Sequence, residues 1–174
     1  HEVLIEALSL IKDIRFFCVL VGDHDTKRNY KSELENRIKF QGLTNKVKIT
    51  GHCKDMVSAY KVSDIVISAS LDPEPFGRIT VEAQAMGCVV VAADHGGAQE
   101  TIQHNRTGIL VEPRNSKALA DGIKKALEMK TEDRTSMGIA AREFVSSNFS
   151  RETMCYRTIS LYCQLLDLNP QLNS

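Results

Sequence analysis

The stretch DIVISASLDPEPFGRITVEAQAMGCVVVAAD, residues 64–94, decides the fold class of this chain. Its two ends, 64–70 and 87–94, are short runs of valine, isoleucine and alanine, which are typical of strands buried on both faces of a parallel sheet. Between them, Pro73 and Pro75 keep the chain out of regular structure, and a helix is expected at about 79–86. A strand, a loop and a helix that lead into a second strand favour an α/β fold.

The same alternation recurs along the rest of the sequence. Further strands are expected at 16–22, 46–51 and 107–113, and further helices near 3–11, 30–42, 54–62 and 98–104. After residue 115 the chain is expected to be helical to about residue 168, with breaks near 131 and 148–150. This alternation predicts a doubly wound, Rossmann-like parallel sheet.

The composition is ordinary for a soluble globular protein and disfavours several other classes. The 174 residues suit one compact domain or one half of a larger protein. The net charge is zero, which disfavours nucleic-acid binding, and no apolar run reaches the roughly 18 residues that span a bilayer. The five cysteines include no CxxC pair, so we expect a reducing compartment without disulfides or zinc. Cys18 and Cys88 lie in apolar runs and are expected to be buried.

Common signals of nucleotide binding and hydrolysis are absent. After the first expected strand, VGDHDT has one glycine where the dinucleotide fingerprint G-x-G-x-x-G needs three. Neither the P-loop pattern nor the G-x-S-x-G elbow occurs. The five histidines are scattered without metal-ligand spacing, so no metal site is expected.

The expected site lies beyond the carboxyl ends of the strands, where ligands bind in open α/β sheets. There, Gly77 allows close approach of a ligand, and the first N–H groups of the next helix form an anion site. Glu74 precedes this helix and Glu82 lies in its first turns. A carboxylate accepts two hydrogen bonds and suits a sugar diol. Tyr60 shares an apolar helical face with Met56 and Val57 and is expected to be core rather than site.

Segments along residues 1–150 resemble, in order, the C-terminal domain of retaining GT-B glycosyltransferases of the group 1, or family 4, type. They are HEVLIEALSLIKD, FFCVLVGD, VKITGH, YKVSDIVISAS, EPFGRITVEAQAMGCVVVAADHGGAQETI and NRTGILVEPRNSKALADGIKKAL. Glu74 and Glu82 match that family's pair of glutamates separated by seven residues. The resemblance implies a nucleotide-sugar-binding domain over 1–150, and a C-terminal helix over 151–174 that packs toward an N-terminal domain.

The resemblance also implies roles for individual residues. Glu74 would hold hydroxyls of the donor sugar and is the candidate catalytic residue, and Glu82 would bind the ribose. The amides of Phe76, Gly77 and Arg78 would meet the sugar or the diphosphate. The remaining expected donor contacts are the nucleotide neighbour Gly22, the nucleobase neighbours Gly51 and His52, and the double-glycine turn Gly96 and Gly97.

The chain departs from the family pattern at its beginning. The family places an arginine and a lysine for the diphosphate just before the first helix, and His1 follows that position. The acceptor domain and the central first strand of the sheet are likewise expected upstream. Because a sheet without that strand has exposed edges, we expect either strand closure across the gap or pairing with a second copy.

The resemblance implies an enzyme of the hexosyltransferase type, with this chain as its donor-binding half, inactive alone. The donor would be a UDP-, GDP- or ADP-sugar, with no metal or other cofactor, and the acceptor a cell-envelope polysaccharide, lipopolysaccharide or other lipid. We expect a cytoplasmic protein without a nucleic-acid partner; association with the inner face of the membrane and self-association of the fragment stay open. Two alternative functions also stay open: a sugar-nucleotide epimerase of the same architecture, and a non-catalytic nucleotide-sugar-binding domain.

Overall fold

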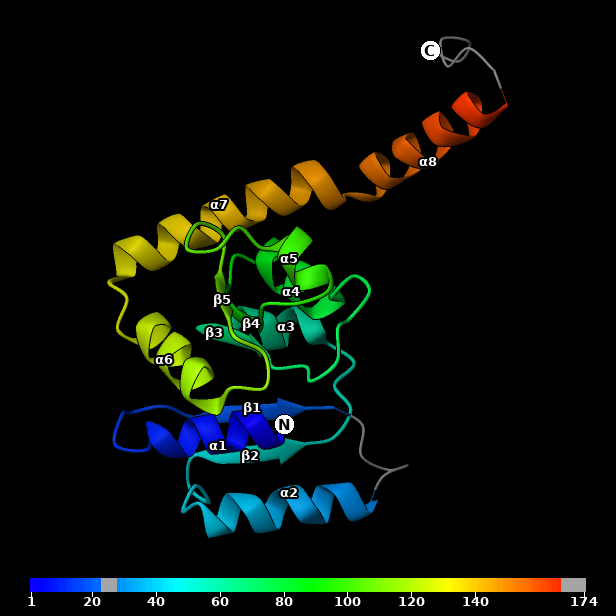
Figure 1. Cartoon of the computed structure of the whole chain (residues 1–174). Helices are drawn as coiled ribbons and strands as arrows, with labels where there is room; N and C mark the ends of the chain where they lie inside the picture. Colours follow the sequence, from blue (N-terminus) through cyan, green and yellow to red (C-terminus); the bar gives the residue numbers. More distant parts are fainter. Residues whose placement is uncertain (23–27, 167–174) are drawn as a thin grey trace.

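The computed structural model describes residues 1–22 and 28–166, and it confirms the alternation of strands and helices (Figure 1). The first part contains α1 (Glu2–Leu10), β1 (Cys18–Val21), α2 (Arg28–Phe40), β2 (Val47–Thr50) and α3 (Met56–Lys61). Next come β3 (Ile65–Ser68), α4 (Arg78–Ala85), β4 (Val89–Ala93), α5 (Gly97–Thr101) and β5 (Ile109–Val111). The last helices are α6 (Ser116–Leu127), α7 (Thr131–Phe149) and α8 (Arg151–Leu165). The predicted breaks near 131 and 148–150 separate these helices.

The strands are parallel, as predicted, but they form two sheets instead of one. In one sheet β1 pairs with β2, from Cys18 opposite Val47 to Val21 opposite Thr50. In the other, β4 lies between β3 and β5. Among the described residues no strand pairing joins the two sheets. The expectation of strand closure across the gap is therefore wrong, and pairing with a second copy stays a prediction.

Apolar packing, not strand pairing, joins the two sheets. Leu8 of α1 lies in one core cluster with Leu20 of β1 and Val91 of β4. Helix α1 also packs along α6 (Figure 1). Burial of apolar surface by α1 thus stabilises the arrangement without hydrogen bonds between the edges of β1 and β3.

The central strand β4 contributes buried side chains to both faces of the three-stranded sheet. All of its residues are buried, and their side chains alternate between two clusters, as in a strand covered on both faces. Val89 and Val91 face the cluster formed with α1 and α6. Val90 and Ala92 face the smaller cluster formed with α3, α4 and α5. The helices therefore cover both faces of this sheet, which confirms the doubly wound arrangement.

The C-terminal helices differ in how they pack. Helix α7 lies against α4, where Gly138 meets the backbone of Gly87 and Arg142 Nε donates to the carbonyl oxygen of Ala85 at 3.0 Å. Helix α8 is N-capped by Ser150 and has no buried residue, and it extends away from the rest of the chain (Figure 1). The expected packing of 151–174 against another domain stays a prediction, and residues 167–174 lie outside the described part. No described helix is long and apolar enough to cross a membrane.

The five cysteines are all free and differ in exposure. Cys88 is buried as predicted, whereas Cys18 is half-buried against the main core. Burial raises the pKa of the Cys18 thiol to about 11.

In the native protein we expect a maleimide to modify the exposed Cys155 first. Modification of Cys88 should be at least about 100-fold slower, because reaction at Cys88 requires local opening that costs about 3 kcal/mol or more. Mass spectrometry of time points measures both rates, and equal rates before denaturation would contradict the buried position of Cys88.

Candidate donor-binding site

The centre of the candidate site is the turn that leads from the loop after β3 into α4. Gly77 is the N-cap of α4 and has a φ of 76°, in the left-handed region that favours glycine. Its carbonyl oxygen accepts hydrogen bonds from the amide of Thr80 at 3.1 Å and from the Thr80 hydroxyl at 2.6 Å. No side chain caps the helix, so its first N–H groups remain directed toward the loop. The helix begins at Arg78, one residue before the predicted start.

A buried polar network fixes α4 against α5. The hydroxyls of Thr80 and Thr101 lie 3.0 Å apart, and the Gln84 amide donates to the carbonyl oxygen of Thr101 at 2.8 Å. All three side chains are buried. The two hydroxyls and Gln84 Nε2 are paired, whereas Gln84 Oε1 is buried without a hydrogen-bond partner among the described residues. Buried hydrogen bonds in a low-dielectric interior rigidify the elements that they join, so the paired groups help to fix the N-terminus of α4 relative to α5.

Gly96 and Gly97, which are predicted to lie beside the donor, directly contact the loop that carries Glu74. The amide of Gly97 donates to the carbonyl oxygen of Glu74 at 2.7 Å. A Cβ at Gly96 would lie 2.6 Å from that oxygen, and a Cβ at Gly97 would lie 2.4 Å from the carbonyl carbon and oxygen of Phe76. These distances are too short for any residue with a side chain, so the two glycines allow one backbone to approach the other.

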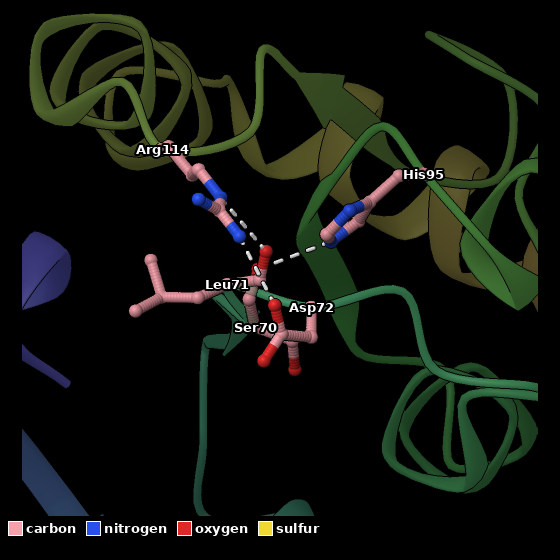
Figure 2. Close-up of polar contacts among 5 residues, drawn as sticks. All are labelled: Ser70, Leu71, Asp72, His95 and Arg114. Carbon is pink, nitrogen blue, oxygen red and sulfur yellow. Dashed lines mark hydrogen bonds and ion pairs between the residues drawn. The ribbon is translucent and has the colours of Figure 1, made fainter.

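Side chains from two other loops make polar contacts with the segment before Glu74 (Figure 2). His95 Nε2 lies 3.0 Å from the carbonyl oxygen of Ser70. Arg114 donates from Nε to the carbonyl oxygen of Leu71 at 3.2 Å and from Nη2 to Asp72 Oδ1 at 3.0 Å. Figure 2 shows His95 and Arg114 reaching this segment from different sides. Neither residue was predicted from the sequence; the adjacent glycines were a signal for His95, whereas nothing in the sequence marks Arg114.

The two predicted glutamates lie on either side of the beginning of α4. Glu74 is half-buried, and its Oε1 accepts a hydrogen bond from the Ser70 hydroxyl. A small pocket beside this carboxylate is lined by Ser68, Ser70, Glu74, Gly77, Thr80, Ala93, His95 and Ala98. Glu82 lies one turn inside α4 and is also half-buried. The structure thus places one carboxylate before the helix N-terminus and one after it.

Glu82 has two side-chain partners. The Tyr60 hydroxyl donates to Oε2 at 3.0 Å, and Arg78 Nη2 donates to Oε1 at 3.0 Å. Tyr60 is buried as predicted, although its expected companion Val57 is exposed. Burial and the hydrogen bond to Glu82 raise the pKa of Tyr60 to about 12, so the phenol is a neutral donor near neutral pH. The donor contact predicted for Arg78 is made by its backbone amide and stays a prediction; the Arg78 side chain is exposed and pairs with Glu82.

Of the other predicted residues, Phe76 lies at the same turn, whereas Gly22, Gly51 and His52 follow the strands of the two-stranded sheet. The Phe76 ring is half exposed and makes an edge-to-face contact with Phe149 at the end of α7, with ring centroids 5.7 Å apart. Gly51 and His52 are exposed and follow β2. Gly22 directly follows β1. The contacts above therefore join Glu74, Gly96 and Gly97, while the expected nucleobase neighbours Gly51 and His52 directly follow β2 of the other sheet.

No group of three or more histidine, cysteine, aspartate or glutamate residues in the described ranges 1–22 and 28–166 is placed to hold a metal ion. The potential ligands at this edge are backbone amides, two carboxylates, hydroxyl groups and arginine. Such groups bind anions and polyols.

Comparison with known proteins identifies relatives with the same fold. The family model of the glycosyl transferases group 1 matches residues 1–144. The crystal structure of a glycosyltransferase from Rickettsia africae ESF-5 is 41% identical with a TM-score of 0.90, over 94% of this chain and 44% of that chain. Anabaena Alr3699/HepE, solved in complex with UDP-glucose, is 32% identical with a TM-score of 0.85, over 94% of this chain and 45% of that chain.

A curated relative matches a shorter part of the chain. The GDP-mannose-dependent alpha-(1-6)-phosphatidylinositol monomannoside mannosyltransferase of Mycobacterium tuberculosis (strain CDC 1551 / Oshkosh) is 37% identical over 86 residues, which are 49% of this chain and 22% of that protein. The chain spans less than half of the length of each of these three proteins. Its architecture matches the C-terminal domain of GT-B glycosyltransferases. From the family match and this architecture, the chain belongs to the glycosyl transferases group 1 family.

Proposed function

We propose that the protein containing this chain transfers a sugar from a nucleoside diphosphate sugar to an acceptor with retention of anomeric configuration, and that this chain binds the donor. The observation that carries the proposal is the position of Glu74 and Glu82 on either side of the glycine-capped N-terminus of α4. The likeness to Anabaena Alr3699/HepE in complex with UDP-glucose supports the same assignment.

Each part of the site matches one part of such a donor. The free N–H groups of α4 and the positive end of its dipole suit the diphosphate and stabilise the charge that develops on it as it leaves. Glu74, held by the Ser70 hydroxyl, would accept hydrogen bonds from the sugar. Glu82 would accept them from the ribose. In this proposal the side chains orient the donor, and no step needs a covalent nucleophile or a metal.

The base and the acceptor are proposed only as classes. Among the relatives, one structure holds UDP-glucose and one enzyme uses GDP-mannose, so we propose a hexose donor on a UDP, GDP or ADP carrier. We propose an acceptor glycan or lipid of the cell envelope, at the cytoplasmic face of the membrane. The phosphatidylinositol monomannoside acceptor named for the mycobacterial relative supports a lipid.

Replacing Glu82 by alanine in the complete protein is expected to weaken nucleotide binding about ten- to a hundredfold. The substitution removes a charge-assisted hydrogen-bond acceptor for the ribose, worth roughly 1.5–3 kcal/mol. Titration calorimetry with UDP, GDP and ADP and their glucose and mannose derivatives measures the affinity. Glu128→Ala, at the end of α6, is the matched control and should leave the affinity unchanged.

Two results would contradict the proposal. If Glu82→Ala and the wild type bind with the same affinity, Glu82 does not hold the ribose. If the wild type binds none of these nucleotides, the chain does not form a donor site. Once a donor and an acceptor have been identified, NMR of the product tests retention, because an inverted anomeric centre would exclude the proposed stereochemistry.

A further inference from the structure

Tyr60 lies on a short helix that is fixed at its beginning. Asp55 is the N-cap of α3 and accepts a hydrogen bond from the amide of Ser58 at 3.0 Å, and this contact with Ser58 lowers the pKa of Asp55. The carbonyl oxygen of Tyr60 also lies 3.2 Å from the Sγ of Cys88, at the beginning of β4. Both the backbone and the side chain of Tyr60 are therefore anchored before the hydroxyl reaches Glu82.

The aromatic ring is enclosed by the smaller apolar cluster. Only 6% of Tyr60 is exposed, and its cluster contains Ala83, Cys88, Val90, Ala92, Ala98 and Ile102. A buried tyrosine has two side-chain torsions, and close packing holds both in one rotamer. The position of its hydroxyl is thus determined by the core of the domain.

The second partner of Glu82 is much less constrained. The side chain of Arg78 is 84% exposed, and an exposed ion pair of this kind contributes little to holding a geometry. The two partners use one position on each carboxylate oxygen. Because a carboxylate has about four acceptor positions, two remain for a pair of neighbouring hydroxyls.

We propose that Tyr60 is a positioning residue that fixes the Glu82 carboxylate for the 2′,3′-diol of the donor ribose and so sets the preference for a ribonucleotide. The inference rests on the proposed function, because it takes Glu82 as the ribose ligand. Tyr60 acts through Glu82 and makes no contact with the donor itself. Without the hydroxyl, the carboxylate would keep only its bond to the exposed Arg78 and would sample other rotamers, which costs binding free energy when the ribose orders it.

Tyr60→Phe in the complete protein separates this role from packing, since it keeps the ring and removes only the hydroxyl. Calorimetry with UDP, GDP and ADP, each compared with its 2′,3′-dideoxy form, measures the preference for the diol. We expect the affinity for the ribonucleotide to fall about three- to tenfold and the affinity for the dideoxy form to stay the same. Tyr156→Phe removes the same atom from an exposed position on α8 and is the matched control.

A double-mutant cycle with Glu82→Ala completes the test. In the Glu82→Ala background, Tyr60→Phe should have no further effect on the ribonucleotide. Three results would each overturn the role of Tyr60. In the first, Tyr60→Phe weakens binding of the ribonucleotide and of the dideoxy form equally; in the second, its affinity for the ribonucleotide is unchanged or tighter. In the third, Tyr60→Phe weakens ribonucleotide binding by the same factor with and without Glu82→Ala. If Glu82→Ala removes the diol preference while Tyr60→Phe keeps it, the inference alone fails. A wild type that binds no nucleotide overturns the proposed function, and the inference with it.

Discussion

The substitution Gly97→Ala is expected both to disrupt the candidate donor site and to destabilise the protein. Its Cβ would lie 2.4 Å from the carbonyl carbon and oxygen of Phe76 and 2.6 Å from the Phe76 Cα. All three are backbone atoms, so the clash cannot be relieved by the movement of a flexible side chain. We expect the free energy of unfolding to fall by about 1–3 kcal/mol or more, the cost of overpacking, and nucleotide binding to fall with it, because the loop carrying Glu74 must shift.

Chemical denaturation and nucleotide calorimetry on the same Gly97→Ala sample measure the two effects. Gly22→Ala is the control for stability: a Cβ there meets no atom of residues 1–22 or 28–166 within 4 Å. At such a position alanine is expected to raise stability by about 0.4–1 kcal/mol through the entropy of the unfolded chain. Wild-type stability and affinity in Gly97→Ala would mean that the two backbones do not touch.

Leu8→Ala is expected to lower the free energy of unfolding by about 2–5 kcal/mol, the range for truncating a buried leucine. Leu8 is 1% exposed and belongs to the cluster that contains strands of both sheets. In a domain of this size the loss corresponds to a decrease in Tm of about 4–20 °C. The cavity would form where α1 replaces strand pairing as the connection between the sheets.

The same helix supplies the control for Leu8→Ala. Leu10 lies two residues farther on and is 57% exposed, so Leu10→Ala should change stability by no more than about 0.5 kcal/mol. Denaturant melts of both variants give the comparison. Losses of similar size for the two leucines would show that the packing of α1 differs from that described.

The order of strands and helices could be predicted from the sequence because the signals that start, end and bury each element lie within a few residues of it. Gly77 marks the start of α4, Asn115 and Ser150 cap α6 and α8 through contacts with backbone amides three residues on, and the valine run at 89–91 is buried as its lack of alternation predicts. Glu74 and Glu82 stood out because both flank one turn. These parts of the fold and site are encoded within short windows of sequence.

The remaining features depend on contacts between distant residues. Tyr60 reaches Glu82 across 22 positions, His95 reaches Ser70 across 25, and Arg114 reaches Leu71 across 43. No spacing rule selects these partners, because loops and crossovers bring them together. The division into two sheets was likewise hidden, since an apolar strand pattern shows that a strand is buried and not which strand lies beside it.

Helix α7 touches the α4 segment near both of its ends. At the far end Gly138 and Arg142 contact Gly87 and Ala85; at the near end Phe149 meets the ring of Phe76, just before the helix begins. These contacts attach both ends of the α4 segment to α7. We therefore expect a substitution that displaces α7 to displace the first amides of α4, and with them the candidate anion site.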